Sequence, residues 1–149
     1  MIDFFDRILL LTRAPFFADV ATDDLRHVAR VLEEESFAAG ERIFAIDERG
    51  DEMYLIASGR VGISIRRDAN ARDFIVVLGE GECFGEMNLL DELPRSATAL
   101  ALDDTHVLTL QKARLRGLLM SYPGIAIGML RAFSLRLRHA HERARERLR

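Results

Sequence analysis

The sequence has one cysteine, Cys83, and its longest apolar runs, residues 8–11 and 74–78, are short. A single cysteine excludes an internal disulfide framework and is typical of a protein from a reducing compartment. A membrane-spanning helix needs roughly 20 apolar residues, so neither run is long enough to cross a bilayer. A secretory signal is not recognisable either. These absences predict a cytoplasmic protein without a membrane span.

Side chains that bind metals or perform covalent catalysis are also few. The four histidines, His27, His106, His139 and His141, are scattered along the chain. His139 and His141 would point in different directions from a helix, which is poor spacing for a metal site. The sequence has no Gly-x-x-x-x-Gly-Lys loop and no nucleophile plausibly paired with a histidine. We therefore expect no catalytic residue and no metal site.

Charge is distributed unevenly along the chain. The formal net charge is −3, but residues 131–149 contain seven arginines and two glutamates, so this segment carries +5 and the rest carries −8. Such a basic tail can contact nucleic acid or an anionic membrane surface, although a solvated helix face is the simpler interpretation.

The length of 149 residues, with 49% apolar and 30% charged side chains, is ordinary for one globular domain, 1–149.

Helical periodicity occurs at both ends of the chain. Leu25, Val28, Ala29 and Leu32 recur at helical spacing, which predicts helices within residues 1–34. After residue 111, a short helix is expected to end near Pro123 and a last helix to run to the end, giving C-terminal helices over 112–149. Small or apolar residues recur along the last helix at intervals of four and three: Ala126, Leu130, Phe133, Leu137, Ala140 and Ala144. This seam would pack on the protein's own body or on a second copy.

The middle of the chain, residues 35–111, consists of short apolar runs separated by glycines and polar turns, a pattern typical of β-strands. The alternation of Val61, Ile63 and Ile65 with small or polar residues predicts a strand with one buried and one exposed face. Turns are expected at 58–59 and 68–70. The expected strand runs are 43–46, 53–57, 61–65, 74–78, 97–102 and 107–110.

The segment 79–98 has the residue types of an anion site. Its glycines allow close approach of the backbone, and a short helical turn at 86–90 would present free amide groups to an anion. Arg95 adds a planar guanidinium that suits one phosphate group. Glu86 can accept hydrogen bonds from a hydroxylated group such as a ribose, which would hold the carboxylate apart from the phosphate.

This segment closely resembles the phosphate-binding cassette of the cyclic nucleotide-binding domain family, which includes protein kinase A regulatory subunits, gated channels and the catabolite activator protein. Phe84-Gly85-Glu86 and Arg95-Ser96-Ala97-Thr98 match the family pattern at its usual interval. Residues 37–43 and 50–61 resemble the family's early strands, so the similarity covers nearly the whole chain. It implies a mainly β fold: a β-roll, similar to a double-stranded jelly roll, of about eight strands with N-terminal helices and a long C-terminal helix.

The resemblance also implies how a ligand is held. Glu86 would bind the ribose 2′-hydroxyl and Arg95 the phosphate oxygens of a cyclic mononucleotide, with cyclic AMP favoured over cyclic GMP because a serine follows the arginine. Closure of the terminal helix would follow as a conformational switch, and Leu130, Arg131 and Phe133 are candidates for a lid over the base. The residues expected at the ligand are Phe84, Gly85, Glu86, Met87, Asn88, Arg95, Ser96, Ala97 and Thr98.

Two residues depart from the family pattern. Asn88 replaces a small apolar residue, and its side chain would either crowd the ligand or form a local cap. Asp47 replaces a glycine in a loop that is far from the cassette in sequence, so we expect that loop to tolerate change. Leu89, Leu90 and Leu93 are expected to be packing residues, and Cys83 a small buried filler without reactivity.

Three functions remain open at this point. The first is a sensor that binds a cyclic nucleotide, performs no chemistry, and acts through a homodimer of its C-terminal helix or through an effector protein. The second is a degenerate roll that serves only as a protein interaction platform. The third is a metal enzyme of the cupin type, which has a similar roll but usually needs clustered histidines. No DNA-binding domain is expected, because a helix-turn-helix does not follow the long helix.

Overall fold

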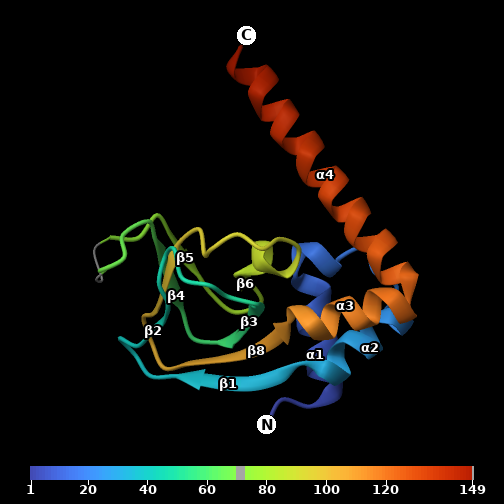
Figure 1. Cartoon of the computed structure of the whole chain (residues 1–149), viewed down its shortest axis with the longest axis horizontal. Coiled ribbons are helices and arrows are strands. Elements are labelled where there is room, and N and C mark those ends of the chain that lie inside the picture. The colour runs from blue at the N-terminus through green and yellow to red at the C-terminus, as the bar shows by residue number, and fades with distance from the viewer. Residues whose placement is uncertain (70–72, 149) are drawn as a thin grey trace.

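The middle of the chain forms eight strands within residues 1–69 and 73–148, the part that this computed structural model describes (Figure 1). They make two four-stranded antiparallel sheets, in the orders β1-β8-β3-β6 and β2-β7-β4-β5. The expected mainly β roll is therefore confirmed. The strands are β1 (Glu33–Phe37), β2 (Arg42–Phe44), β3 (Glu52–Ser58), β4 (Val61–Ser64), β5 (Val76–Leu78), β6 (Cys83–Phe84), β7 (Thr98–Ala101) and β8 (Thr105–Gln111).

Two strands were not expected from the sequence. β1 is largely polar, so it has no apolar alternation to mark it, and it forms because it pairs with β8 from Glu33↔Thr109 to Phe37↔Thr105. Residues 33–34 consequently belong to a strand and not to the N-terminal helices. β6 has only two residues, and its pairing with β3 defines it.

The expected alternation of faces in β4 is wrong. Gly62 is buried because the ring of Phe74 covers it, and a Cβ at this position would lie 2.5 Å from ring atoms. Ser64 is fully buried, and its hydroxyl accepts a hydrogen bond from the Arg66 amide at 3.0 Å. Ile65 follows the end of the strand and is 66% exposed. β4 is therefore covered on both faces.

The turn at 58–59 is confirmed, whereas residue 70 of the other expected turn lies outside the described residues.

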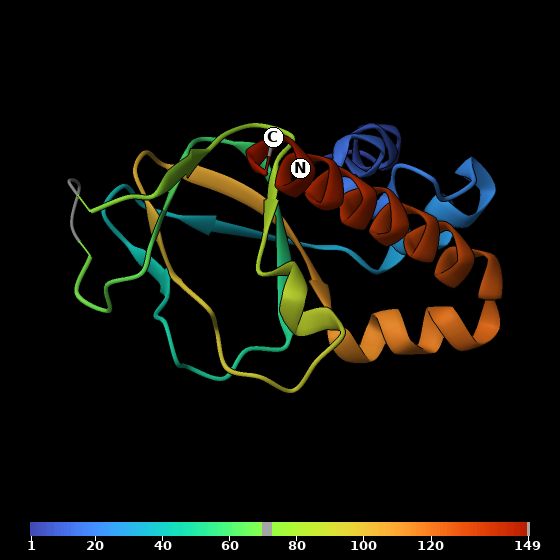
Figure 2. The same ribbon diagram turned by 90° about the horizontal axis from the view of Figure 1, so that it is seen from above.

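The helices pack at one end of the roll (Figures 1 and 2). Asp3 caps the first by accepting a hydrogen bond from the Asp6 amide at 2.8 Å. Pro123 is the first residue of the last, as its fixed φ favours. The helices are α1 (Phe4–Arg13), α2 (Thr22–Val31), α3 (Lys112–Ser121) and α4 (Pro123–Arg147), with the 3-10 helices η1 (Pro15–Phe17) and η2 (Glu86–Leu89).

Strand β3 separates two hydrophobic cores. Met53 and Leu55 belong to the core that the helices cover, whereas Tyr54 and Ile56 point into the roll. This division follows from the two-residue period of a strand. Full burial of each large apolar side chain contributes about 1.5–3 kcal/mol, so both faces of β3 hold the fold together.

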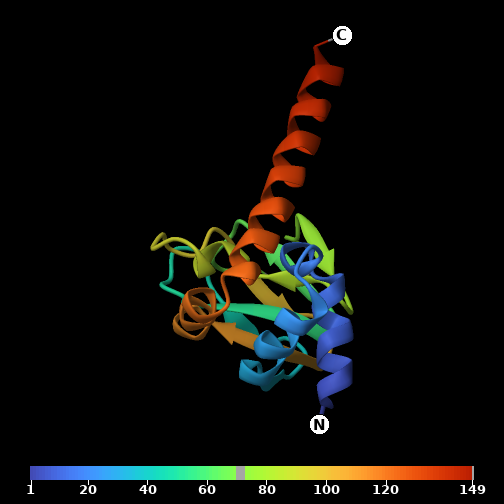
Figure 3. The ribbon, with the colours of Figure 1, turned by 90° about the vertical axis from the view of Figure 1, so that its right-hand side faces the viewer.

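Helix α4 is buried only near its start. Its buried residues are Ile125, Gly128, Met129 and Ala132, and every described residue after Phe133 is exposed. A Cβ at Gly128 would lie 2.8 Å from the carbonyl oxygen of Asp19, so glycine is required for this close packing. The rest of the helix extends away from the body (Figures 1 and 3). Most of the expected seam, including Leu130 and Leu137, is thus exposed and does not pack on the roll.

Among the described residues, no single helix is long and apolar enough to cross a membrane. Helices α3 and α4 reach the required length and composition only when they are taken together, and they are bent by 112° at their junction.

Candidate functional site

A cavity of about 260 Å³ lies between β4, β5 and the cassette. Eight of the nine residues expected at the ligand line it: Phe84, Gly85, Glu86, Met87, Asn88, Arg95, Ser96 and Ala97. The ninth, Thr98, is buried outside the lining, and its hydroxyl accepts a hydrogen bond from the Ile46 amide at 2.9 Å. Thr98 therefore supports the neighbouring loop. The remaining lining residues, which the sequence did not indicate, are Phe44, Ile63, Val76, Leu78 and Cys83.

The structure explains why position 85 of the cassette is a glycine. Gly85 has φ +75°, in the left-handed region, and it precedes the 3-10 turn η2. A Cβ here would lie 2.8 Å from Arg95 Nη1 and 3.1 Å from the carbonyl oxygen of Glu52. Only glycine combines this backbone conformation with such close approach to the arginine.

Arg95 is a buried cation with neutral acceptors. The residue is 3% exposed, and its Nη1 donates hydrogen bonds to the carbonyl oxygens of Glu52 (2.9 Å) and Gly85 (3.4 Å) and to Asn88 Oδ1 (3.2 Å). Its Nε is buried without a hydrogen-bond partner, and no carboxylate in residues 1–69 and 73–148 forms an ion pair with it. A buried charge without an ion-pair partner is costly, so the site favours an anion.

Aromatic rings hold the guanidinium from the side. Its Cζ lies 4.1 Å from the ring centre of Phe44 and 5.8 Å from that of Tyr54, within cation–π range. Burial lowers the pKa of the Arg95 guanidinium, while Tyr54 and acidic residues, including Glu52, oppose this change. Arginine remains charged in proteins, so the cavity keeps a fixed positive group.

The loop containing Asp47 corrects another expectation. It is far from the cassette in sequence, but the Arg95 amide donates to the carbonyl oxygen of Glu48 at 2.7 Å, and the Asp47 amide donates to that of Arg95 at 2.9 Å. Asp47 has φ +72°, which explains why a glycine suits this position. A Cβ at Gly50 would overlap the guanidinium. This loop holds the arginine and is therefore not a neutral place for substitution.

The cavity has a polar end and an apolar wall. Glu86, Ser96 and Arg95 supply the polar groups, whereas Val76 and Leu78 belong to the apolar wall. Such a site suits an anionic ligand that carries a flat or apolar group.

Of the three leucines expected to pack, only Leu89 is buried, and Leu90 and Leu93 are 51% and 67% exposed.

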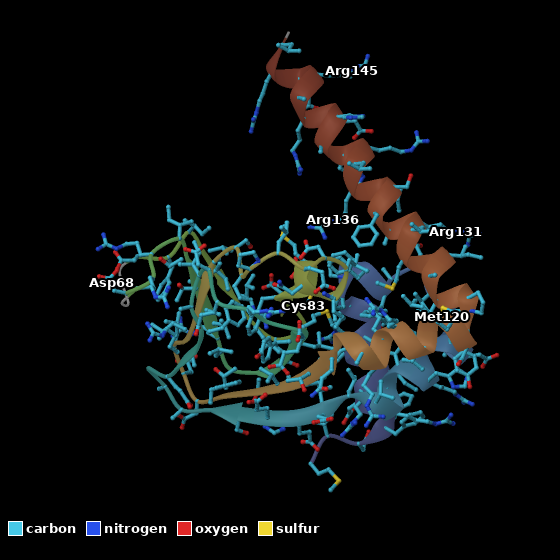
Figure 4. All side chains as sticks on the ribbon, in the orientation of Figure 1. Asp68, Cys83, Met120, Arg131, Arg136 and Arg145 are labelled. Carbon is cyan, nitrogen blue, oxygen red and sulfur yellow. The ribbon has the colours of Figure 1, made fainter. Side chains whose placement is uncertain are left out.

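A second cavity of about 210 Å³ adjoins the cassette on the side of α4. Cys83 and Glu86 line both cavities, and Arg136 of α4 lines the second. The Arg136 guanidinium lies 5.1 Å from the ring centre of Phe16, and Figure 4 shows the side chain between α4 and the roll. Cys83 is only partly buried and not the fully buried filler that was expected, but the raised pKa of its thiol, about 12 because of desolvation, agrees with the expected lack of reactivity. Arg136 is the residue of α4 that reaches the cassette.

The three lid candidates do not line the first cavity. Phe133 packs on Phe16 with ring centres 4.7 Å apart, and Leu130 is 65% exposed. Arg131 points away from the roll (Figure 4). Their role as a lid therefore remains a prediction that needs a movement of α4.

The comparisons with known proteins agree with this geometry. A family model described as "Cyclic nucleotide-binding domain" matches residues 34–122. The chain belongs to the cyclic nucleotide-binding domain family. Among its residues 1–69 and 73–148, no group of three or more His, Cys, Asp or Glu side chains could hold a metal ion, so the cupin alternative has no candidate centre there.

Similar members of the cyclic nucleotide-binding domain family include bacterial regulators. A CRP-like cAMP-activated global transcriptional regulator of Mycobacterium tuberculosis is 28% identical over 89% of this chain, and the cyclic AMP receptor protein of Thermus thermophilus is 32% identical over 85%. The chain spans 59% of the length of each. The N-terminal domain of a Streptomyces coelicolor transcriptional regulator is 29% identical, with a TM-score of 0.80 over 91% of this chain and 94% of that one. The Thermus thermophilus catabolite activator protein gives a TM-score of 0.70 over 87% of this chain and 61% of that one.

Proposed function

We propose that this cyclic nucleotide-binding domain is a sensor that binds cyclic AMP in the cassette cavity without transforming it. The observation that carries the proposal is Arg95, a guanidinium that is 3% exposed and bonded only to neutral acceptors among the described residues. A phosphodiester would supply the missing counter-charge. The cytoplasmic location of the protein stays a prediction.

The polar groups of the cavity suit the three parts of the ligand. Arg95 binds the exocyclic phosphate oxygens, and backbone amides near Gly85, Asn88 and Ala97 complete the phosphate cradle. Glu86 accepts a hydrogen bond from the ribose 2′-hydroxyl. The base lies against the apolar wall that contains Val76 and Leu78.

The preference for cyclic AMP rests on Ser96. This residue is exposed, and its hydroxyl has a weak contact of 3.9 Å with Met87 Sδ, so it is available to a ligand. A threonine at this place is often found in family members that prefer cyclic GMP. The names of the similar Mycobacterium and Thermus regulators, which refer to cyclic AMP, support the same choice.

The signal leaves the domain through α4. Glu86 lines both the nucleotide cavity and the cavity that contains Arg136, so a change at the ribose-binding carboxylate reaches α4 directly. Movement of α4 would bring Leu130, Arg131 or Phe133 over the base. In a Cys83→Ser background, spin labels at Arg60→Cys and His139→Cys should report a changed distance on addition of cyclic AMP. An unchanged distance at saturating ligand would remove α4 movement from the proposal.

The exposed half of α4 is the proposed output surface. Leu130 and Leu137 are 65% and 64% exposed, and the seam continues through Ala140 and Ala144. It suits another helix, either from a second copy of this chain or from an effector protein. Light scattering with and without cyclic AMP separates the two, because a homodimer doubles the mass of the purified chain alone.

The decisive experiment is a calorimetric titration with cyclic AMP and cyclic GMP. Removal of a desolvated partner of a charged group costs about 2–5 kcal/mol, so Arg95→Ala should weaken cyclic AMP binding about 30-fold or more. Arg60→Ala is the matched control, because Arg60 is exposed and pairs with Asp103 away from the cavity. If the wild-type chain bound neither nucleotide, the protein interaction platform would be the better interpretation.

A further inference from the structure

Asn88 is a polar residue that is almost completely buried inside the cassette. It is 4% exposed and belongs to η2, at a position where the family pattern has a small apolar residue. A buried amide requires hydrogen-bond partners on both sides. Its Nδ2 donates to the carbonyl oxygen of Leu93 at 2.6 Å, and its Oδ1 accepts from Arg95 Nη1 at 3.2 Å. The side chain thus joins the arginine to the loop that follows η2.

That loop is fixed from its other side. The Leu93 amide donates to Asp91 Oδ1 at 3.1 Å. Lys112, the single lysine of the chain, donates to the carbonyl oxygen of Asp91 and forms an ion pair with Glu92 at 3.1 Å. Because Lys112 is the first residue of α3, the anchor of the Asn88 amide is attached to a helix.

The Asn88 contact also determines which edge of the guanidinium is free. All three hydrogen bonds that Arg95 makes through its side chain come from Nη1. Within the described ranges 1–69 and 73–148, Nη2 has no protein acceptor. Because three protein acceptors already hold Nη1, Nη2 is left as the terminal nitrogen that can donate to an incoming oxygen.

We propose that the Asn88 side chain is a positioning residue for nucleotide binding, which orients Arg95 by holding Nη1 and leaves Nη2 for the phosphate. This inference rests on the proposed function of the cavity. In this proposal the Asn88 side-chain amide supports Arg95 and does not compete with the ligand for space. Preorganisation of this kind increases affinity because less rotational freedom is lost on binding.

Two substitutions of Asn88 distinguish a role in orienting Arg95 from a role in stabilising the fold. Asn88→Ala removes both hydrogen bonds and should weaken cyclic AMP binding about tenfold. Asn88→Asp keeps an acceptor for Nη1 but adds a negative charge that neutralises Arg95 and repels the phosphate. It should leave the ligand-free protein at least as resistant to urea as Asn88→Ala, and yet bind cyclic AMP more weakly. Leu93→Ala is the control, because it removes an exposed side chain and keeps the backbone acceptor.

A second measurement does not depend on the ligand. Urea midpoints are compared for wild type, Asn88→Ala, Arg95→Met and the double variant, all without nucleotide. We expect Asn88→Ala to lower the midpoint clearly less in the Arg95→Met background than in wild type. Additive midpoints, or Asn88→Ala binding cyclic AMP as tightly as wild type or more tightly, would overturn the inference. If wild type binds no nucleotide, the proposed function fails, while the midpoints still decide whether Asn88 and Arg95 are coupled.

Discussion

Two largely buried arginines on opposite sides of sheet β1-β8-β3-β6 have different surroundings. Arg7 pairs with Glu34 at 3.5 Å and donates to the carbonyl oxygens of Ile2, Ala29 and Leu32. Arg95 is more deeply buried, but it has neutral acceptors and aromatic rings around it. Arg7 therefore completes an ionic cluster, whereas Arg95 forms no ion pair with a carboxylate of the described residues.

The difference shows how a structural cation can be told from a binding one. Glu34 is shared by Arg7, the Ile2 amide and His106, and Ser36 also contacts His106 at 2.7 Å. This network ties the N-terminal segment to β1 and β8, and its groups are satisfied without a ligand. Around Arg95, Nε has no hydrogen-bond partner and Nη2 has no acceptor among the described residues. Substitutions at the two arginines should consequently affect different properties.

The largest effect is expected for Arg95→Met, which keeps the length of the side chain and removes the charge. Cyclic AMP binding should fall about 30-fold or more, since about 2–5 kcal/mol is lost with the phosphate partner. The free energy of unfolding without ligand should stay within about 1 kcal/mol of wild type, because the loss of one donor to three neutral acceptors is offset by the removal of a buried charge that has no ion-pair partner. Calorimetry and urea denaturation measure the two quantities. A large loss of stability together with unchanged cyclic AMP affinity would mean that Arg95 is the structural cation and not the binding one.

Arg7→Met should give the opposite pattern. It leaves Glu34 without its arginine and two carbonyl oxygens of the α2 end without a donor, so the free energy of unfolding should fall by about 2 kcal/mol. Cyclic AMP affinity of the folded protein should not change, because Arg7 lies outside the cassette cavity. Urea denaturation at neutral pH followed by a titration checks both. A tenfold loss of affinity would mean that this cluster also supports the cavity.

The local part of the site could be predicted from the sequence. Glycine, glutamate and arginine of the cassette lie within eleven residues of one another, and the chemistry of each residue type indicates its role. What could not be predicted comes from distant segments. Phe44 and Gly50 enclose Arg95 only because β2 and the loop before β3 fold next to the cassette. The Gly50-Asp51 match to the family was the signal that could have indicated this.

The two ends of the chain show a similar limit. The helical period predicted α4 and its start at Pro123, but the helix has two adjacent apolar faces, and periodicity alone did not indicate which one the body covers. The structure buries Ile125 and Met129 and leaves Leu130 exposed. β1 was missed because its pairing with β8, and not its own residues, makes it a strand.

A smaller effect is expected when the carboxylate of the Arg7 cluster is neutralised by pH. The hydrogen bond with His106, followed by that from the Ile2 amide, lowers the pKa of Glu34 below its ordinary value of 4.5. Because the folded-state pKa is the lower one, Glu34 stabilises the fold above about pH 4.5, and this contribution is lost as the pH falls through the folded-state value. The stability difference between wild type and Glu34→Gln should shrink between pH 6 and about pH 3. A difference that is constant over this range would contradict the assignment.

The smallest effect concerns the backbone that holds Arg95. Asp47 is the single non-glycine residue with positive φ in the described part of the chain, and its amide donates to the carbonyl oxygen of Arg95. A left-handed conformation costs a residue with a side chain about 1–2 kcal/mol, partly offset by the greater freedom of an unfolded glycine. Asp47→Gly should therefore raise the free energy of unfolding by about 0.5 kcal/mol and keep cyclic AMP affinity. Asp47→Val should lower both, because a β-branched residue resists this conformation and would shift the loop against Arg95. Equal stability of the glycine and valine variants would show that the loop adapts freely and does not position the arginine.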